Sequence, residues 1–133
     1  MCGIAGVWDF KRHASADSLR ESALQMATAL THRGPDDEGI FLDPDVCLAL
    51  AHRRLSVIDL SAQGHQPMAS SCGRFTIVYN GEIYNTGELA SDLIRCGRRF
   101  RGHSDTEVLL EGCVEHGIEK FIQRVNGIFA FAL

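Results

Sequence analysis

A short apolar run, residues 3–8, directly follows a cysteine at position 2. Its glycines and its interruption at Asp9 predict a buried β-strand that begins almost with the chain. We expect Met1 to be removed because cysteine is small, which leaves Cys2 with both a thiol and a free α-amino group. An α-amino group titrates at about pH 7.7–8.0, which suits a general base, and a thiol is a good nucleophile once deprotonated. Cys2 could therefore act as an N-terminal nucleophile, although a lone cysteine at position 2 is more often incidental.

Composition restricts the class of protein. A chain of 133 residues suffices for one domain with a hydrophobic core. The net charge of −4 argues against a surface for nucleic acid or anionic membrane. No apolar run approaches the roughly 20 residues of a membrane span, and no basic segment precedes the first one, so we expect a cytoplasmic protein. The cysteines show no C-x-x-C spacing and the histidines no H-x-x-x-H spacing, so we expect neither disulfides nor a metal site.

Hydrophobic periodicity and turn residues predict the order of the elements. They predict strands over residues 3–8, 39–42, 46–51, 75–79, 82–84 and 128–133, and helices over 18–31, from Asn85 to a stop at Gly97, from Ser104 to a stop at Gly117, and over 119–125. Residues 43–45 predict the turn of a hairpin between the strands at 39–42 and 46–51. Asn80-Gly81 predicts a tight turn, Ser18 and Glu21 a capping box, and residues 61–71 a loop. This order predicts an α+β fold with largely antiparallel sheets. Because the sequence stops within its last strand, we expect the N-terminal piece of a longer protein.

Several residues could support a thiol that attacks a carbonyl group, a reaction that needs oxyanion donors and anchors for the substrate's charged ends. Asn80 and Gly81 offer a side-chain amide and an unhindered backbone N–H, although a plain hairpin turn is the commoner outcome. Arg54 could bind a carboxylate bidentately or simply be solvated. Asp105 lies at a predicted helix N-terminus and could bind an amine or only cap the helix. Glu82 is either a ligand or a polar strand residue.

The remaining basic residues could form a phosphate or nucleic-acid patch, but in an acidic protein a solvated surface is the commoner outcome. Arg53 is the arginine we expect in solvent, and the basic cluster around Arg95, Arg98, Arg99 and Arg101 is interpreted as a solvated loop. Neither G-x-x-x-x-G-K-[ST] nor G-x-G-x-x-G occurs, so no phosphate-binding loop is indicated.

Six segments carry a resemblance that spans the chain: MCGIAG at 1–6, HRGPDDEG at 32–39, AHRRLSVID at 51–59, YNGEIYN at 79–85, GHSDTE at 102–107 and NGIFAFAL at 126–133. Together they resemble the class II, or N-terminal nucleophile, glutamine amidotransferase domain of the asparagine synthetases. The glutaminase domains of the phosphoribosyl-pyrophosphate and fructose-6-phosphate amidotransferases share the leading Cys-Gly-Ile. They carry a Thr-Arg-Trp type motif where this chain has HRRLS, so the resemblance favours the asparagine-synthetase-like branch.

The resemblance implies an αββα sandwich of antiparallel sheets, here incomplete, because the family's domain continues past the strand that ends this sequence. It implies that Cys2 attacks the side-chain amide of glutamine and forms a thioester, that ammonia leaves, and that water releases glutamate. Asn80 and the Gly81 N–H would form the oxyanion hole, and Arg54 would hold the α-carboxylate. The other binding residues it implies are Asp105 with Glu82 for the α-amino group, and Leu55, Ser56, Val57 and Ile58 for the pocket wall.

The family's synthetase domain, with its ATP-binding Ser-Gly-Gly-x-Asp-Ser loop, is not in this sequence. Residues 1–133 are therefore expected to be a partial glutamine amidotransferase domain without a cofactor, ATP and Mg²⁺ belonging to the synthetase domain. The expected partners are L-glutamine and that downstream domain, where the ammonia would amidate aspartate, and a homodimer stays open. Two alternatives remain: a truncated, inactive remnant with a binding or assembly role, and a Cys–His hydrolase with an internal base.

Overall fold

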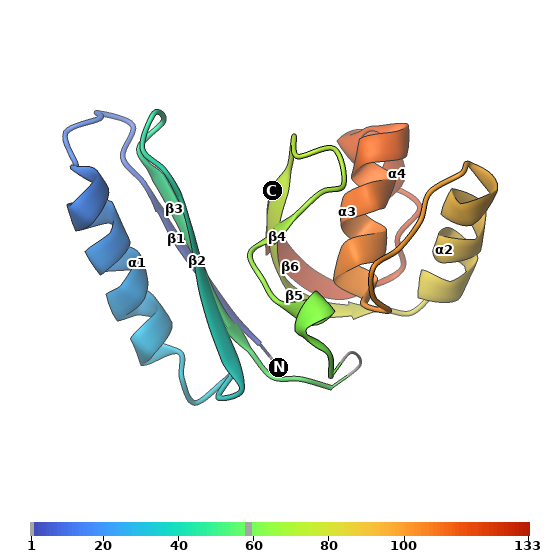
Figure 1. Cartoon of the computed structure of the whole chain (residues 1–133), viewed down its shortest axis with the longest axis horizontal. Coiled ribbons are helices and arrows are strands. Elements are labelled where there is room, and N and C mark those ends of the chain that lie inside the picture. The colour runs from blue at the N-terminus through green and yellow to red at the C-terminus, as the bar shows by residue number, and fades with distance from the viewer. Residues whose placement is uncertain (1, 58–59) are drawn as a thin grey trace.

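Two antiparallel sheets face each other, and the outer side of the first is covered by one helix and that of the second by several (Figure 1). The computed structural model describes residues 2–57 and 60–133. The strands are β1 (Gly3–Trp8), β2 (Asp37–Asp43), β3 (Leu48–Arg54), β4 (Met68–Ala69), β5 (Thr76–Ile83) and β6 (Gly127–Ala132). The helices are α1 (Ala16–Ala29), the 3-10 helix η1 (Ala62–Gly64), α2 (Thr86–Arg95), α3 (Asp105–His116) and α4 (Ile118–Ile122). The layers α1, β1-β3-β2, β4-β5-β6 and α2–α4 confirm the predicted αββα arrangement (Figure 1).

The first sheet packs against α1 through small side chains. Leu19, Ala23 and Ala27 recur every fourth residue, which places them on one face of the helix. They pack against Ala49 and Ala51, which are almost fully buried on β3. Because side chains alternate along a strand, the intervening residues of β3 face the second sheet.

The second sheet is built around β5, which pairs antiparallel with β4 on one side and β6 on the other. Ile77 of β5 is fully buried against the helices, where it belongs to one core cluster with Leu93, Leu109 and Phe121. β5 also carries the Asn80-Gly81 pair, so this core holds in place a strand with predicted site residues.

Asn80-Gly81 forms no turn, so that prediction was wrong. β5 continues through both residues, with Asn80 opposite Ala130 and Gly81 opposite Phe129 of β6. A Cβ atom at Gly81 would lie 2.5 Å from the Phe129 Cα, so glycine is required by close approach of the neighbouring strand. The local hairpin signal is overridden because the partner strand comes from the far end of the sequence.

Two smaller predictions also need correction. Helix α1 begins earlier than expected, because the Ser15 side chain caps it by accepting from the Ser18 N–H at 3.2 Å. Ser18 therefore lies inside the first turn and does not head a capping box. The predicted loop at 61–71 contains η1 and β4. The predicted hairpin of β2 and β3 and the helix start at Ser104 are confirmed.

No helix within residues 2–57 and 60–133 is long and apolar enough to cross a bilayer.

Candidate active site

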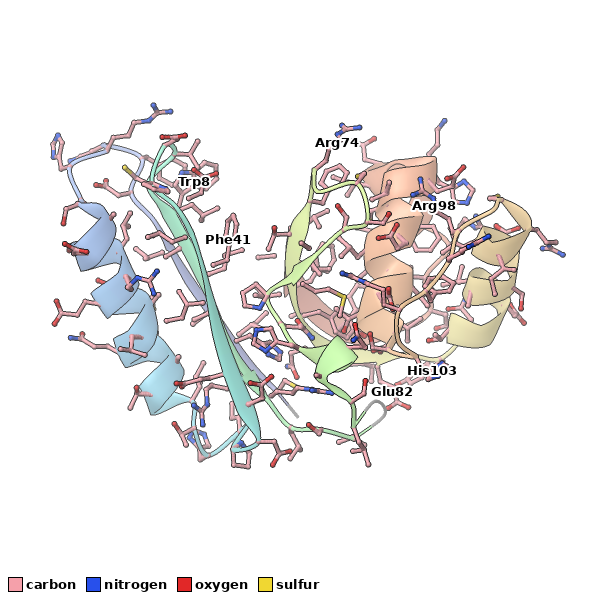
Figure 2. All side chains as sticks on the ribbon, viewed as in Figure 1. Trp8, Phe41, Arg74, Glu82, Arg98 and His103 are labelled. Carbon is pink, nitrogen blue, oxygen red and sulfur yellow. The ribbon has the colours of Figure 1, made fainter. Side chains whose placement is uncertain are left out.

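A cavity of about 340 Å³ is lined by residues of both sheets and by Cys2, which directly precedes β1. Cys2, Arg54, Asn80, Gly81 and Asp105, which come from separate segments of the sequence, all line it. In Figure 2, Glu82, which also lines the cavity, lies at the lower end of the molecule, where Figure 1 marks the N-terminus, and Trp8 lies at the opposite end. The structure therefore brings these sequence-predicted site residues into one place.

Cys2 is held at the edge of this cavity by two neighbouring segments. Its backbone carbonyl accepts a hydrogen bond from the Arg33 Nε at 3.0 Å. Its sulfur accepts from the Leu55 N–H at 3.4 Å and lies 3.7 Å from the Leu55 carbonyl oxygen. The thiol is half-buried, so it is both oriented and accessible from the cavity. The expected removal of Met1 falls on a residue outside those that the structure describes.

Arg54 is buried and faces the cavity. It ends β3, and its Nη1 donates to the Ser61 carbonyl at 2.9 Å. The guanidinium lies against Gly64, where a Cβ atom would come within 2.7 Å of the Arg54 Cζ. A buried guanidinium with fixed geometry is suited to binding a carboxylate bidentately. The alternative of an ordinary solvated arginine does not apply to Arg54.

Arg53, the arginine expected in solvent, is not solvated, because only 11% of its side chain is exposed. It points to the opposite face of the sheet, as alternation along β3 requires. There it donates from Nε to the Gly34 carbonyl at 2.9 Å and forms an ion pair with Glu38. Arg53 therefore fastens the 32–39 segment to the first sheet.

Asp105 presents a buried carboxylate at the first position of α3, where the helix dipole favours negative charge. Its Oδ2 accepts from the Tyr79 hydroxyl at 2.9 Å and from the Ile83 N–H at 3.1 Å, and its Oδ1 from the Thr106 N–H at 2.9 Å. Ser104, not Asp105, caps the helix by accepting from the Glu107 N–H at 3.2 Å. Plain capping therefore does not explain Asp105, which lines the cavity.

Tyr79 joins the Asp105 carboxylate to the second sheet. Burial of the phenol, together with the adjacent Asp105 carboxylate, raises the pKa of Tyr79 well above its ordinary value. The hydroxyl therefore stays protonated and acts as a donor to Asp105 throughout the neutral range.

The rest of the predicted wall is only partly present. Leu55 and Val57 line the cavity, but Ser56 does not, and its N–H donates to Asp36 Oδ2 at 2.7 Å. Ile58 lies outside the described residues. Sequence reasoning missed other lining residues, namely Gly64, Gln66, Tyr79, Tyr84, Ser104, Thr106 and Ile128. Tyr79 and Thr106 directly adjoin predicted site residues, which is the signal that could have found them.

No histidine is among the described residues that line the cavity, which weakens the alternative of an internal Cys–His pair. His52 is buried instead between the sheets, with Nε2 3.1 Å from the Tyr79 carbonyl oxygen. Burial lowers the pKa of His52 to about 4. In the parts of the chain that the structure describes, no cluster of three or more His, Cys, Asp or Glu side chains could hold a metal ion.

The basic cluster is largely paired with carboxylates. Arg98 bonds to Glu115 at 2.8 Å and lies 3.4 Å from the buried Glu111. Arg101 lies 3.2 Å from the buried Glu107. These ion pairs fasten the 98–101 segment to α3. Arg101 is still exposed, as expected of a solvated loop, whereas the Arg98 side chain is only 25% exposed, so the prediction was wrong for Arg98.

Comparison with known proteins identifies the family. A family model described as a glutamine amidotransferase domain matches residues 1–133. The chain is 41% identical to asparagine synthetase [glutamine-hydrolyzing] 3 of Bacillus subtilis (strain 168), over all of this chain and 21% of that protein. It is also 41% identical to asparagine synthetase B of Escherichia coli (strain K12), of which it covers 23%. The chain thus spans about a fifth of the length of these curated relatives. It belongs to the glutamine amidotransferase domain family, and its sequence is similar to part of the glutamine-hydrolysing asparagine synthetases.

Proposed function

We propose that this chain hydrolyses the side-chain amide of glutamine to glutamate and ammonia, with Cys2 as the nucleophile. The observation that carries the proposal is the shared cavity, in which the Cys2 thiol, the Arg54 guanidinium and the Asp105 carboxylate meet the Asn80-Gly81 pair. The family to which the chain belongs supports the same reaction class.

The charges of the cavity suit a free α-amino acid. Arg54 supplies a buried cation for the α-carboxylate, and Asp105 supplies a buried anion for the α-ammonium group. Such pairs are stronger where water is excluded than on an open surface. A cavity of about 340 Å³ also falls within the usual size of small-molecule sites, about 300–1,000 Å³. Leu55 and Val57 supply apolar contacts beside these charges, and Glu82, which also lines the cavity, would assist at the amine.

The chemistry follows from the position of Cys2. The sulfur attacks the side-chain carbonyl carbon of glutamine, and the α-amino group of Cys2 takes up the thiol proton. The oxyanion that develops would accept hydrogen bonds from the Asn80 amide and the Gly81 N–H. The C–N bond then breaks, and the protonated amine returns its proton so that ammonia leaves. Water attacks the resulting thioester, which releases glutamate and restores the Cys2 thiol.

The ammonia needs an acceptor, which we propose lies in a longer parent protein. The names of the curated relatives join glutamine hydrolysis to asparagine synthesis. By this likeness, a synthetase domain of the parent would amidate aspartate with ATP and Mg²⁺, and the present chain would need no cofactor. The proposal includes a cytoplasmic location. A homodimer is compatible with it.

The test is release of glutamate from glutamine by the purified chain, after intact mass has verified that Met1 is removed. We expect Cys2→Ala to abolish the activity and Cys96→Ala, at an exposed cysteine, to leave it unchanged. Unchanged glutamate release by Cys2→Ala would show that the nucleophile is misassigned. A diazoketone analogue of glutamine should add covalently to Cys2. A folded sample that neither hydrolyses glutamine nor takes up the analogue would support the inactive remnant instead.

A further inference from the structure

We propose that His52 is a positioning residue, which holds the oxyanion donors of the second sheet in register with the nucleophile of the first. The inference rests on the proposed function, because it assigns a role to a residue outside the cavity in the same reaction.

His52 lies at the centre of the first sheet, opposite Ile4 of β1 and Gly39 of β2. Its side chain crosses to the second sheet, where Nε2 lies 3.1 Å from the Tyr79 carbonyl oxygen. Only 1% of the residue is exposed. Since a carbonyl oxygen can only accept, the imidazole must donate its Nε2–H.

The His52–Tyr79 hydrogen bond lies along a part of β5 that does not pair with β4. β4 pairs only with Thr76 and Ile77 of β5, so Tyr79 lies beyond its end. The Tyr79 N–H instead donates to the Gln66 Oε1 at 2.6 Å, while the Tyr79 carbonyl accepts from His52. Two side chains therefore replace the missing strand, and the one from His52 belongs to the opposite sheet.

Both ends of this hydrogen bond are close in sequence to the proposed machinery. Tyr79 directly precedes Asn80. On the other sheet, His52 lies two residues before Arg54, and its partner Ile4 lies two residues after Cys2. A shift of the Tyr79 carbonyl would carry Asn80 with it, because the peptide units between them are planar and rigid. The hydrogen bond thus fixes the distance between the nucleophile and the oxyanion donors.

The charge state of the ring fits this role. Nδ1 is buried and finds no hydrogen-bond partner among the residues described. A neutral ring with its single proton on Nε2 satisfies the Tyr79 carbonyl, whereas a cation would bury a second N–H without an acceptor. The other charged or titratable groups that act on the ring are Asp37 on β2, Arg54 on β3 and His65 after η1. Burial outweighs the Asp37 carboxylate and lowers the pKa of His52 to about 4, so the ring is neutral at pH 7.

This role predicts that substitutions of His52 change kcat but not KM. Glutamine would bind through the side chains of Arg54 and Asp105, whereas the hydrogen bond of His52 goes to the Tyr79 backbone. The oxyanion forms only as the reaction proceeds, so misplaced donors lower kcat and leave KM nearly unchanged. We expect His52→Phe, which keeps the ring and removes the donor, to lower kcat by about tenfold or more with KM within about twofold.

His52→Gln provides the matched rescue, because its side-chain amide can donate in place of Nε2. We expect it to recover most of the kcat that His52→Phe loses. His13→Gln, the same substitution at an exposed histidine, should behave like the unaltered chain. Imidazole ¹⁵N NMR at pH 7 supplies a measurement that needs no variant, and it should show one buried neutral ring protonated on Nε2.

The outcomes separate the two proposals. If Cys2→Ala abolishes hydrolysis but His52→Phe retains full kcat, the inference about His52 is wrong and the glutaminase proposal stands. A ring protonated on Nδ1 in the NMR experiment also overturns the inference, even where His52→Phe fails to fold. If Cys2→Ala retains hydrolysis, the glutaminase proposal falls, and the role of His52 falls with it.

Discussion

The backbone N–H of Leu55 donates to the sulfur of Cys2 at 3.4 Å, so the residue that follows Arg54 orients the proposed nucleophile. The contact follows from the register of the first sheet, in which Gly3 lies opposite Arg53. Because β1 and β3 are antiparallel, the start of β1 lies beside the end of β3. The Cys2 thiol and the Arg54 guanidinium therefore belong to the same cavity. One strand register thus fixes both the attacking group and the anchor for the α-carboxylate.

Arg54→Lys tests that anchor. Lysine keeps the positive charge but lacks the planar fork that binds a carboxylate bidentately, so we expect the KM for glutamine to rise about tenfold or more with little change in kcat. Steady-state glutamine hydrolysis measures both constants. Arg99→Lys, at an exposed position, should leave both unchanged. An unaltered KM in Arg54→Lys would mean that another group holds the α-carboxylate.

Tyr79→Phe tests the hydroxyl that supports Asp105. The substitution removes one of the donors to a buried carboxylate, so we expect the free energy of unfolding to fall by about 1–3 kcal/mol. Tyr84→Phe is the matched control, because that side chain is 56% exposed. Urea unfolding at neutral pH compares the two variants. Equal stability in both would show that the Tyr79–Asp105 hydrogen bond contributes nothing net to folding.

Gly81→Ala tests the close approach of β6. A Cβ atom at Gly81 would lie 2.5 Å from the Ile128 carbonyl oxygen, and backbone cannot move away cheaply, so we expect a loss of about 1–3 kcal/mol in stability. Gly87→Ala is the contrast, because nothing lies within 4 Å of its added methyl group and the site is exposed on α2. There we expect an unchanged or slightly higher stability, by up to about 1 kcal/mol. Thermal or urea unfolding checks both, and a tolerated Gly81→Ala would rule out the steric explanation for the glycine.

Local signals in the sequence identified most elements, and the failures share a physical cause. The Ser104 cap and the β2–β3 hairpin depend on residues close together in the chain, and both were predicted correctly. Asn80-Gly81 carries an equally strong local turn signal, but its conformation is set by pairing with β6. Helix α1 starts directly after Ser15 because the Ser15 side chain caps it. Ser18 has the same side chain three residues later, and hydrophobic periodicity alone does not tell which of the two serines is the cap.

The sequence predicted which residue types would act in the cavity better than it predicted which side chains would face it. Cys2 and Asp105 were chosen because their residue types suit the reaction, and both line the cavity. Arg53 and Arg54 are the same residue type side by side, and only the direction of alternation along β3 tells which one faces the second sheet. The bond from His52 to Tyr79 joins two sheets and leaves no trace in either local sequence.

The dependence of the free energy of unfolding on pH tests whether His52 is buried as a neutral ring. In the unfolded chain an imidazole has a pKa of about 6.5, whereas burial lowers the pKa of folded His52 to about 4. Between these two pH values the unfolded state binds more protons than the folded state. The contribution of His52 to the free energy of unfolding is therefore complete above pH 6.5. It is lost progressively as the pH falls toward 4, by about 3 kcal/mol in all. We expect His52→Gln to flatten that part of the profile of unfolding free energy against pH, measured by urea unfolding. His13→Gln should keep the full slope, and parallel profiles for His52→Gln and the unaltered chain would contradict a neutral buried ring.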